Sequence, residues 1–138
     1  MTSEFGVAVH ALVFLNHKGR TVSSEELSQN ICTNPARVRK IMAKLKRAGL
    51  LSTKEGVDGG YLFSLDPAEV SLREISEALE VQFVASAWRS GDTDMKCLIA
   101  SGMADVMDGI YSDLDRLCKE HLEQVTIQQI DDRIFSKK

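Results

Sequence analysis

A dense cluster of positive charge lies between Arg37 and Arg47. It contains six basic side chains and no acidic one: Arg37, Arg39, Lys40, Lys44, Lys46 and Arg47. Ammonium and guanidinium groups at this density attract a polyanion, because each phosphate that they neutralise releases condensed counterions. The net charge of the whole chain is −3, but residues 1–65 sum to +4 and residues 66–138 sum to −7. The cluster therefore indicates a nucleic-acid contact in the first half of an otherwise acidic chain.

The basic side chains belong to a helix whose ends are both marked in the sequence. Asn34 is a favoured N-cap residue, Pro35 suits the first helical position, and Gly49 suits the position just beyond the end. Apolar residues recur at intervals of three and four: Val38, Ile41, Met42, Leu45 and Ala48. We expect the helix over residues 34–48 to pack along this stripe. A second face collects cations: Arg37, Lys40, Lys44 and Arg47.

Two helices are expected before the basic helix. Apolar residues at helical spacing predict the first over residues 3–17, with Ser3 as its cap. Ser23, followed three residues later by Glu26, is a capping-box pattern and predicts the second helix over residues 24–30. Two short helices followed by a capped basic helix are typical of a helix-turn-helix unit.

A glycine-rich hairpin is expected after the basic helix, with strands at residues 50–53 and 61–65. This order predicts a winged helix-turn-helix, in which the basic helix enters the major groove and the hairpin, or wing, approaches the backbone or minor groove. The candidate DNA contacts are Asn34, Ala36, Arg37, Arg39, Lys40, Lys44 and Arg47 in the helix, with Lys54, Gly59, Gly60 and Tyr61 in the wing. Base edges are nearest to the start of the helix, where Arg can pair with guanine and Asn with adenine.

The second half of the chain is predicted to be helical, except for one segment whose secondary structure the sequence pattern does not predict. A capping box predicts a helix over residues 71–79, and Thr126 caps a final short helix. Residues 82–94 end in loop-forming residues, although Phe83 and Trp88 indicate that part of the segment is packed or contacts a partner.

A long helical pattern runs from about Lys96 to Gln124. Six of its apolar positions are candidate dimer contacts: Met103, Val106, Met107, Ile110, Leu114 and Leu117. The predicted fold is mainly α with a small β-hairpin. Residues 1–67 form a winged helix-turn-helix, residues 68–95 a helix and sensing loop, and residues 96–138 the dimerisation and C-terminal helices of one compact domain.

The sequence resembles the Rrf-two (Rrf2) family of bacterial transcription regulators over nearly its whole length. Four segments carry the resemblance: RVRKIMAKLKRAGL at residues 37–50, Gly59-Gly60-Tyr61 in the wing, residues 71–79 and residues 126–130. The resemblance implies a homodimer held by the long helix, paired winged helices on a palindromic operator, and a sensing segment between the wing and the long helix.

Two departures from the family pattern matter. Many relatives carry Arg immediately before the first wing glycine, whereas this chain has Glu55 before Gly56, and a carboxylate repels phosphate. Relatives that bind an iron–sulfur cluster place three Cys residues close together between the wing and the long helix, whereas this chain has only Cys97 there. We therefore expect no cofactor and no iron–sulfur cluster.

Cys32 and Cys97 are the candidate redox residues. Cys32 comes just before the basic helix, where the helix dipole and Arg37 favour a reactive thiolate. In a dimer, Cys97 can approach Cys32 of the other copy to form a reversible disulfide. The alternative is that these two residues and Cys118 are ordinary packed thiols.

Other classes of function find little support in the sequence. His10, His17 and His121 lack the clustered spacing of a metal site, the hairpin glycines lack the ending of a phosphate loop, and no catalytic triad stands out. We therefore expect no enzyme activity. Without an apolar run of the roughly 18 residues that a membrane span needs, and without a secretory signal, we expect a cytoplasmic protein.

These patterns together predict a sequence-specific regulator that binds double-stranded DNA as a homodimer, acts as a repressor and responds to thiol oxidation. Two alternatives stay open. The winged helix can serve as a protein-interaction module, or the regulator can respond to a small molecule without a redox switch, with Phe83 and Trp88 lining its pocket.

Overall fold

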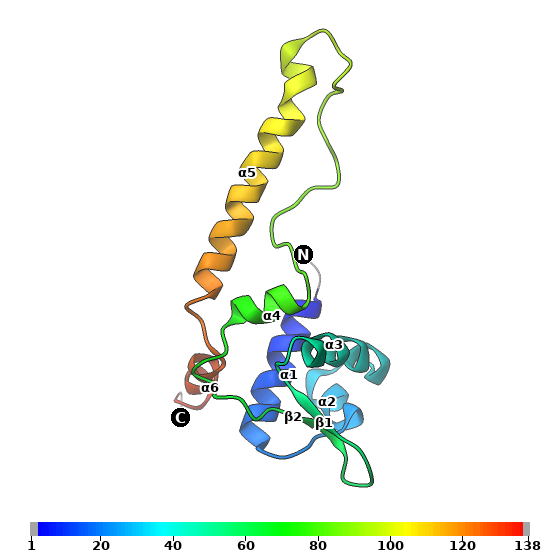
Figure 1. Ribbon diagram of the computed structural model, residues 1–138, viewed down its shortest axis with the longest axis vertical. Coiled ribbons are helices and arrows are strands. Elements are labelled where there is room, and N and C mark those ends of the chain that lie inside the picture. Colours follow the sequence, from blue (N-terminus) through cyan, green and yellow to red (C-terminus); the bar gives the residue numbers. More distant parts are fainter. Residues whose placement is uncertain (1–2, 137–138) are drawn as a thin grey trace.

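The computed structural model describes residues 3–136, within which six helices and one two-stranded hairpin form a body and a projecting arm (Figure 1). The body contains the two termini of the described chain, and the arm consists of one long helix and the segment that leads into it. The elements in chain order are α1 (Glu4–Lys18), α2 (Ser24–Ile31), α3 (Pro35–Arg47), β1 (Ser52–Lys54), β2 (Gly60–Leu62), α4 (Leu72–Ala78), α5 (Leu98–Leu122) and α6 (Ile127–Phe135). This architecture confirms the predicted fold class.

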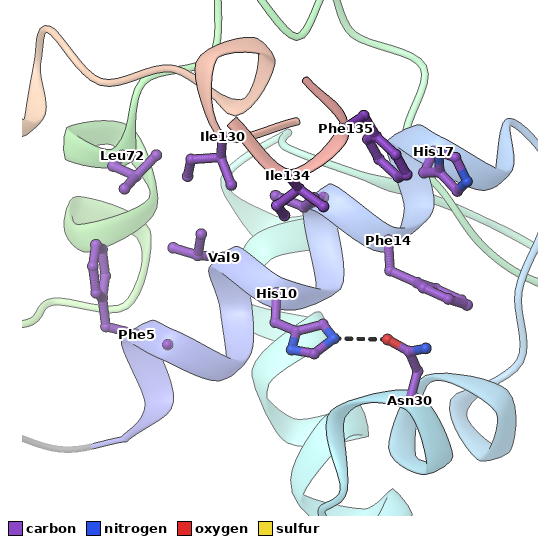
Figure 2. Close-up of a pocket in the computed structure, with 12 residues that line it drawn as sticks. Phe5, Val9, His10, Phe14, His17, Asn30, Leu72, Ile130, Ile134 and Phe135 are labelled. Atoms are coloured by element: carbon purple, nitrogen blue, oxygen red, sulfur yellow. Dashed lines mark hydrogen bonds between the residues drawn. The ribbon is translucent and has the colours of Figure 1, made fainter. Parts of the chain in front are cut away.

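The core of the body forms around α1, which contacts α2, α3, α4 and α6. Leu12 and Leu15 of α1 are fully buried, as are Ile41 and Leu45 of α3. The predicted apolar stripe of the basic helix therefore packs as expected, except that Ala48 is the C-cap residue of α3 and is exposed. On another side of α1, α6 lies across the helix and an apolar pocket remains between them (Figure 2).

Local capping signals fix where most helices begin. The Asn34 side chain accepts a hydrogen bond from the Arg37 amide at 2.8 Å, and the predicted box of Ser71 and Glu74 forms in both directions at 3.3 Å. The predicted box of Ser23 and Glu26 forms only in part: the Ser23 hydroxyl accepts from the Glu26 amide at 3.1 Å, but the Glu26 carboxylate pairs with Arg20 at 2.8 Å. Ser3 is the exception, because it stands at the N-cap position of α1 but its side chain makes no capping hydrogen bond.

The wing strands are shorter than predicted, because the predicted strand residues farthest from the hairpin turn are buried in the core. Strand β1 pairs with β2 in antiparallel register, with Thr53 opposite Tyr61. Leu50, Leu51 and Phe63 are buried, so the chain on both sides of the hairpin packs against the helices instead of extending the ladder. An additional bridge joins the wing to the chain that enters α2, where Tyr61 exchanges backbone hydrogen bonds with Val22 at 2.8 and 2.9 Å.

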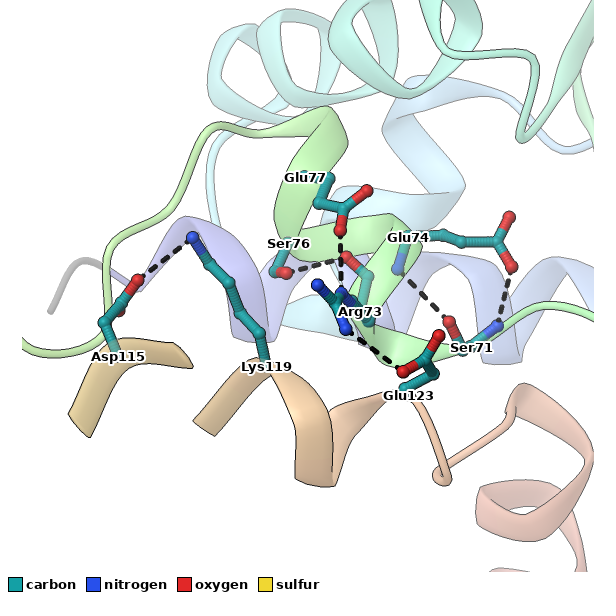
Figure 3. A network of polar contacts seen from close by, with 8 residues as sticks. All are labelled: Ser71, Arg73, Glu74, Ser76, Glu77, Asp115, Lys119 and Glu123. Atoms are coloured by element: carbon teal, nitrogen blue, oxygen red, sulfur yellow. Dashed lines mark hydrogen bonds and ion pairs between the residues drawn. The ribbon is translucent and has the colours of Figure 1, made fainter. Parts of the chain in front are cut away.

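A polar network fastens the base of the arm to α4 (Figure 3). Arg73 of α4 donates to Glu77 on its own helix at 2.9 Å and to Glu123 just beyond α5 at 3.0 Å. Higher on α5, the Asp115 carboxylate accepts from the backbone amides of Phe83 and Val84. The same carboxylate pairs with Lys119 at 3.0 Å. These contacts set the direction in which α5 leaves the body.

The segment that precedes α5 runs alongside the helix without regular secondary structure (Figure 1). Phe83 packs edge-on against Phe5 of α1 with ring centroids 5.0 Å apart, whereas the Trp88 side chain is 75% exposed. Arg89 pairs with Asp105 and Asp108 and thereby holds the segment to α5. The predicted packing is therefore confirmed for Phe83, whereas for Trp88 only the alternative, contact with a partner, remains as a prediction.

Among the described residues, no helix is both long enough and apolar enough to cross a membrane.

Candidate nucleic-acid interface

The solvent-facing side of α3 combines cations with small residues. Six exposed residues form it: Ala36, Arg39, Lys40, Ala43, Lys46 and Arg47. The two alanines allow the helix backbone to approach a groove, and an Ala methyl group can contact the methyl group of thymine. Sequence reasoning missed Ala43 and Lys46, although Ala43 lies three residues beyond Lys40 and therefore on the same helix face.

Two of the predicted contacts turn away from this face toward the start of α1. Arg37 donates to the Ser3 hydroxyl. Ser3 itself has a helical backbone conformation (φ −79°, ψ −4°) instead of the extended one of a capping residue, and it does not cap its own helix. Lys44 forms an ion pair with Glu4 at 3.2 Å, and both side chains are only 26% exposed. The single stripe of four cations that the spacing predicts is thus divided, since Arg37 and Lys44 are half-buried and engaged within the protein.

The remaining cations differ in how freely they can move. The Arg39 guanidinium lies 3.3 Å from the Ser24 hydroxyl, and Lys46 donates to Thr53 of β1 at 2.9 Å. Within residues 3–136, the side chains of Lys40 and Arg47 make no hydrogen bond or ion pair. These two are consequently the α3 cations that can reach a phosphate without breaking an internal contact.

Asn34 is exposed, but the oxygen of its side chain already accepts a hydrogen bond within the protein. Its Oδ1 atom accepts the capping hydrogen bond from Arg37, so the Nδ2 group remains for a base edge. The bidentate contact to adenine that the sequence suggests needs both the donor and the acceptor of an Asn side chain. While Asn34 caps the helix, its Nδ2 group stays available as a donor to a base edge, and its Oδ1 atom has one lone pair left.

The glycines of the wing serve the packing of the wing itself. A Cβ atom at Gly59 would lie 2.4 Å from the Lys54 carbonyl oxygen, and one at Gly60 would lie 2.4 Å from the Val22 carbonyl oxygen. Tyr61 is half-buried, and this burial raises the pKa of its phenol. The Gly-Gly-Tyr motif thus docks the hairpin on the chain that enters α2.

The wing tip presents a fully exposed Val57 together with two carboxylates. Glu55 and Asp58 lie on either side of Val57, and both are exposed, as is Lys54. The Thr21 hydroxyl donates to the Asp58 carbonyl oxygen at 2.8 Å and holds the tip near the body. The carboxylates make the tip a poor phosphate contact, as Glu55 alone suggests in the sequence.

The arm provides a second unpaired surface. The six predicted dimer positions lie on α5, where five are exposed and Met107 is half-exposed. At the start of the helix, Leu98 is 85% exposed and Ile99 is 70% exposed. The apolar stripe continues through Val106, Ile110, Leu114 and Leu117. A helix with one long exposed apolar stripe needs a partner to bury it.

The two candidate redox residues occupy opposite ends of helices. Cys32 is the C-cap residue of α2, with φ 65°, and its thiol donates to the Gln29 carbonyl oxygen at 3.6 Å. Cys97 is exposed and is the N-cap residue of α5. The backbone amides of Ala100 and Ile99 lower the pKa of Cys97, because N–H groups at a helix start stabilise a thiolate. The structure therefore favours a thiolate at Cys97, whereas the sequence predicted the reactive thiolate at Cys32.

Comparison with known proteins agrees with this geometry. A family model described as "Rrf2: Iron-dependent Transcriptional regulator" matches residues 1–133. YwnA of Bacillus subtilis strain 168, which carries the name of an HTH-type transcriptional regulator, is 27% identical over 135 residues, covering 98% of this chain and 99% of the relative.

Two solved structures have the same fold. A transcriptional regulator from Lactobacillus plantarum matches with a TM-score of 0.83 and 25% identity, over 98% of this chain and 92% of that one. IscR of T. potens matches with a TM-score of 0.73 and 16% identity, over 100% of this chain and 90% of that one.

The description of the family as iron-dependent raises the question of an iron site in this chain. An iron–sulfur cluster needs about four converging ligands, mostly thiolates. Cys118 lies 21 residues beyond Cys97 on the same helix, which is about 30 Å along the axis, and Cys32 lies between α2 and α3. Among residues 3–136, no three His, Cys, Asp or Glu side chains gather as a metal site. The donor set of one chain does not fit a cluster.

Proposed function

Because the chain belongs to the Rrf2 family of transcriptional regulators, we propose that it binds a palindromic operator as a homodimer and represses transcription there. Family membership makes the chain a helix-turn-helix regulator and not an enzyme. The observation that carries the proposal is the exposed face of α3, where Lys40 and Arg47 are uncommitted and Ala36 and Ala43 leave the backbone accessible.

The exposed apolar stripe of α5 supports the dimer in this proposal. Two copies related by a two-fold axis bury this stripe against each other and present two α3 helices to the DNA. A two-fold protein matches a palindrome whose half-sites lie one helical turn, or a multiple of it, apart. Repression follows when the operator overlaps a promoter, because the bound dimer then covers DNA that the polymerase needs.

Binding to genomic fragments, including the promoter of the protein's own gene, tests the core of this proposal. We expect a footprint with two-fold symmetry, and loss of binding in the double variant Lys40→Ala with Arg47→Ala. Arg116→Ala, which removes an exposed cation from the arm, is the matched control. If no fragment is preferred over random DNA, the winged helix is a protein-interaction module instead.

We further propose that thiol oxidation controls binding, with Cys97 as the first residue to react. A peroxide oxidises the Cys97 thiolate to a sulfenic acid and is itself reduced to water or an alcohol. A second thiol, for which Cys32 of the partner copy is the candidate, then condenses with the sulfenic acid and releases water to leave a disulfide.

The exposure of Cys97 and the lowered pKa of its thiol support this order of events. Hydrogen peroxide should weaken operator binding by the wild type, with recovery in dithiothreitol, and should leave Cys97→Ser unaffected. If Cys97→Ser loses binding to the same extent in peroxide, the thiol proposal is wrong.

A further inference from the structure

One arginine on the solvent-facing side of α3 is exposed and yet held in place. The Arg39 side chain is 53% exposed, and its Nη1 group donates to the Ser24 hydroxyl of α2 at 3.3 Å. The same nitrogen lies 3.9 Å from the Glu25 carboxylate, to which the Ser24 hydroxyl donates at 3.3 Å. The guanidinium is therefore tethered through one nitrogen to the first turn of α2.

The tether leaves one edge of the guanidinium free. Within residues 3–136, the Nε and Nη2 groups of Arg39 make no hydrogen bond. These two groups are neighbouring donors in one plane, and such a fork matches the O6 and N7 acceptors that guanine presents in the major groove. Arg39 can therefore contact a guanine without giving up its contact with α2.

The other basic residues of α3 are less suited to reading a base. Arg37 is half-buried and donates to Ser3, and the lysines carry a single ammonium group instead of a planar fork. Arg47 has the fork, but it lies in the last turn of the helix, and no hydrogen bond or ion pair within the described chain orients it. Base edges are contacted by the N-terminal part of a recognition helix, and Arg39 is the fifth of the 13 residues of α3.

Small residues flank Arg39 on the same side of the helix. Ala36 is three residues before it and Ala43 is four residues after it, and both are exposed. Without long side chains at these two positions, the helix backbone can come close to the DNA. A side chain that starts near the groove can extend to a base edge.

The position of Glu25 is not explained by attraction to a polyanion. Its carboxylate is 67% exposed next to Arg39, where it repels phosphate and offsets the charge of the guanidinium. Burial raises the pKa of the Tyr61 phenol, Arg39 lowers it and Glu25 raises it, so both charged groups also lie near the wing. A carboxylate that weakens phosphate binding but orients a guanidinium favours discrimination between sequences over affinity for all of them.

We propose that Arg39 reads one guanine in each half-site of the operator and that Ser24 and Glu25 are positioning residues for its guanidinium. This inference rests on the proposed operator binding and identifies the residue that selects a base. The Nε and Nη2 groups donate to guanine while Nη1 stays on α2.

Selection of bound duplexes from a random DNA library, followed by fluorescence anisotropy on the selected duplex, tests the assignment. The wild type should select a two-fold symmetric sequence with a guanine in each half-site that Arg39→Ala no longer selects. Replacing one such guanine by 7-deazaguanine, which lacks the N7 acceptor, should weaken wild-type binding about fivefold or more and leave binding by Arg39→Ala unchanged. Inosine keeps O6 and N7 and is the matched control for the base.

Three further variants separate base reading from charge and from folding. Arg39→Lys keeps the charge but lacks the fork, so it should keep the salt dependence and lose the guanine preference. Glu25→Gln should reduce the preference, while its binding to random DNA is at least as tight as that of the wild type because a negative charge is removed. A folding defect would weaken both. Lys40→Ala should weaken binding to all sequences by the same factor and keep the preference.

The outcomes distinguish this inference from the operator proposal. If Arg39→Ala selects the same sequence as the wild type, or loses affinity equally for every sequence, Arg39 does not read a base and the inference is wrong, although operator binding stands. Full guanine preference in both Ser24→Ala and Glu25→Gln would overturn the positioning role. A wild type that selects no sequence would overturn operator binding itself.

Discussion

Replacing Lys40 with Ala should weaken DNA binding in a way that depends on salt, whereas the same change at Lys44 should not. Lys40 is exposed, and its side chain makes no hydrogen bond or ion pair within the described chain, so it is available to a phosphate. Lys44 is held by Glu4 at 3.2 Å and is largely covered. The two lysines are four residues apart on one helix and have the same chemistry, so they form a matched pair of perturbations.

The size of the effect follows from counterion release. Each phosphate contact contributes about 0.9 to the slope of log affinity against log salt, and a dimer loses two contacts, so Lys40→Ala should lower the slope by about 1.8. Between about 50 and 200 mM salt, the affinity of Lys40→Ala should consequently fall about 12-fold less than that of the wild type. Lys44→Ala should leave the slope unchanged and cost at most about 1 kcal/mol of unfolding free energy, because a partly exposed ion pair contributes little.

Fluorescence anisotropy with a labelled operator at four or more salt concentrations measures both slopes, and urea unfolding measures the stability. Equal slopes for Lys40→Ala and the wild type would mean that Lys40 does not meet a phosphate. An equal loss of slope in the two variants would mean that the Glu4 ion pair opens on DNA, and the division of the α3 cations would then be irrelevant to binding.

Three further predictions concern the wing, the thiol and the arm. Gly60→Ala should disorder the wing and lower thermal stability, because the added Cβ atom meets the Val22 carbonyl oxygen at 2.4 Å; an unchanged melting temperature would contradict this. Iodoacetamide should alkylate Cys97 at pH 7 faster in the folded protein than in urea, because folding lowers the pKa of this thiol; equal rates by mass spectrometry would refute the helix-start effect. Burial opposes ionisation of Asp115, but Lys119 and the amides of Val84 and Phe83 outweigh it, so folding lowers the pKa of this carboxyl. Its contribution to stability should be complete above the usual Asp pKa and disappear as the pH falls through the lowered value. The protection of the Phe83 amide, which is its exchange rate relative to the intrinsic rate at the same pH, should therefore fall in the wild type as Asp115 becomes protonated. Asp115→Asn should show low protection even at neutral pH, and equal protection in the two proteins would contradict this prediction.

The sequence predicts the helices well because their signals are local. The caps at Asn34 and Ser71 act within four residues, and periodicity identifies the buried side of α3 without knowledge of its neighbours. The long helix is predicted from about Lys96 to Gln124 and observed at Leu98–Leu122, a difference of two residues at each end.

The contacts that the sequence does not predict join distant residues. Lys44 meets Glu4 from 40 positions away, and Arg37 meets Ser3 from 34 positions away. Periodicity places cations on a helix face but does not reveal which neighbouring helix covers part of that face. The pocket between α1 and α6 escapes sequence analysis for the same reason, because its walls come from segments separated by more than 100 residues.

The position of the reactive thiol depends on a helix boundary. Cys32 stands two residues before Asn34, and the sequence-based argument assigned it to the start of the basic helix. In the structure the residue ends α2 in a left-handed conformation, and its thiol points to a carbonyl oxygen of that helix. Cys97 opens a helix of 25 residues, which places backbone N–H groups beside its sulfur.

The spacing of the apolar stripe on the arm also determines how two arms wind. Ile99 and Ile110, Met103 and Leu114, and Val106 and Leu117 are each separated by eleven residues. From Ile99 to Leu117 the stripe completes five turns in 18 residues, which is 3.6 residues per turn and matches a straight α-helix instead of the 3.5 of a left-handed coiled coil. Paired arms of this kind are nearly straight spacers. One residue inserted into the middle of α5 would rotate its tip by about 100° and turn the apolar seam away from its partner, whereas eleven inserted residues would restore the seam on a longer arm.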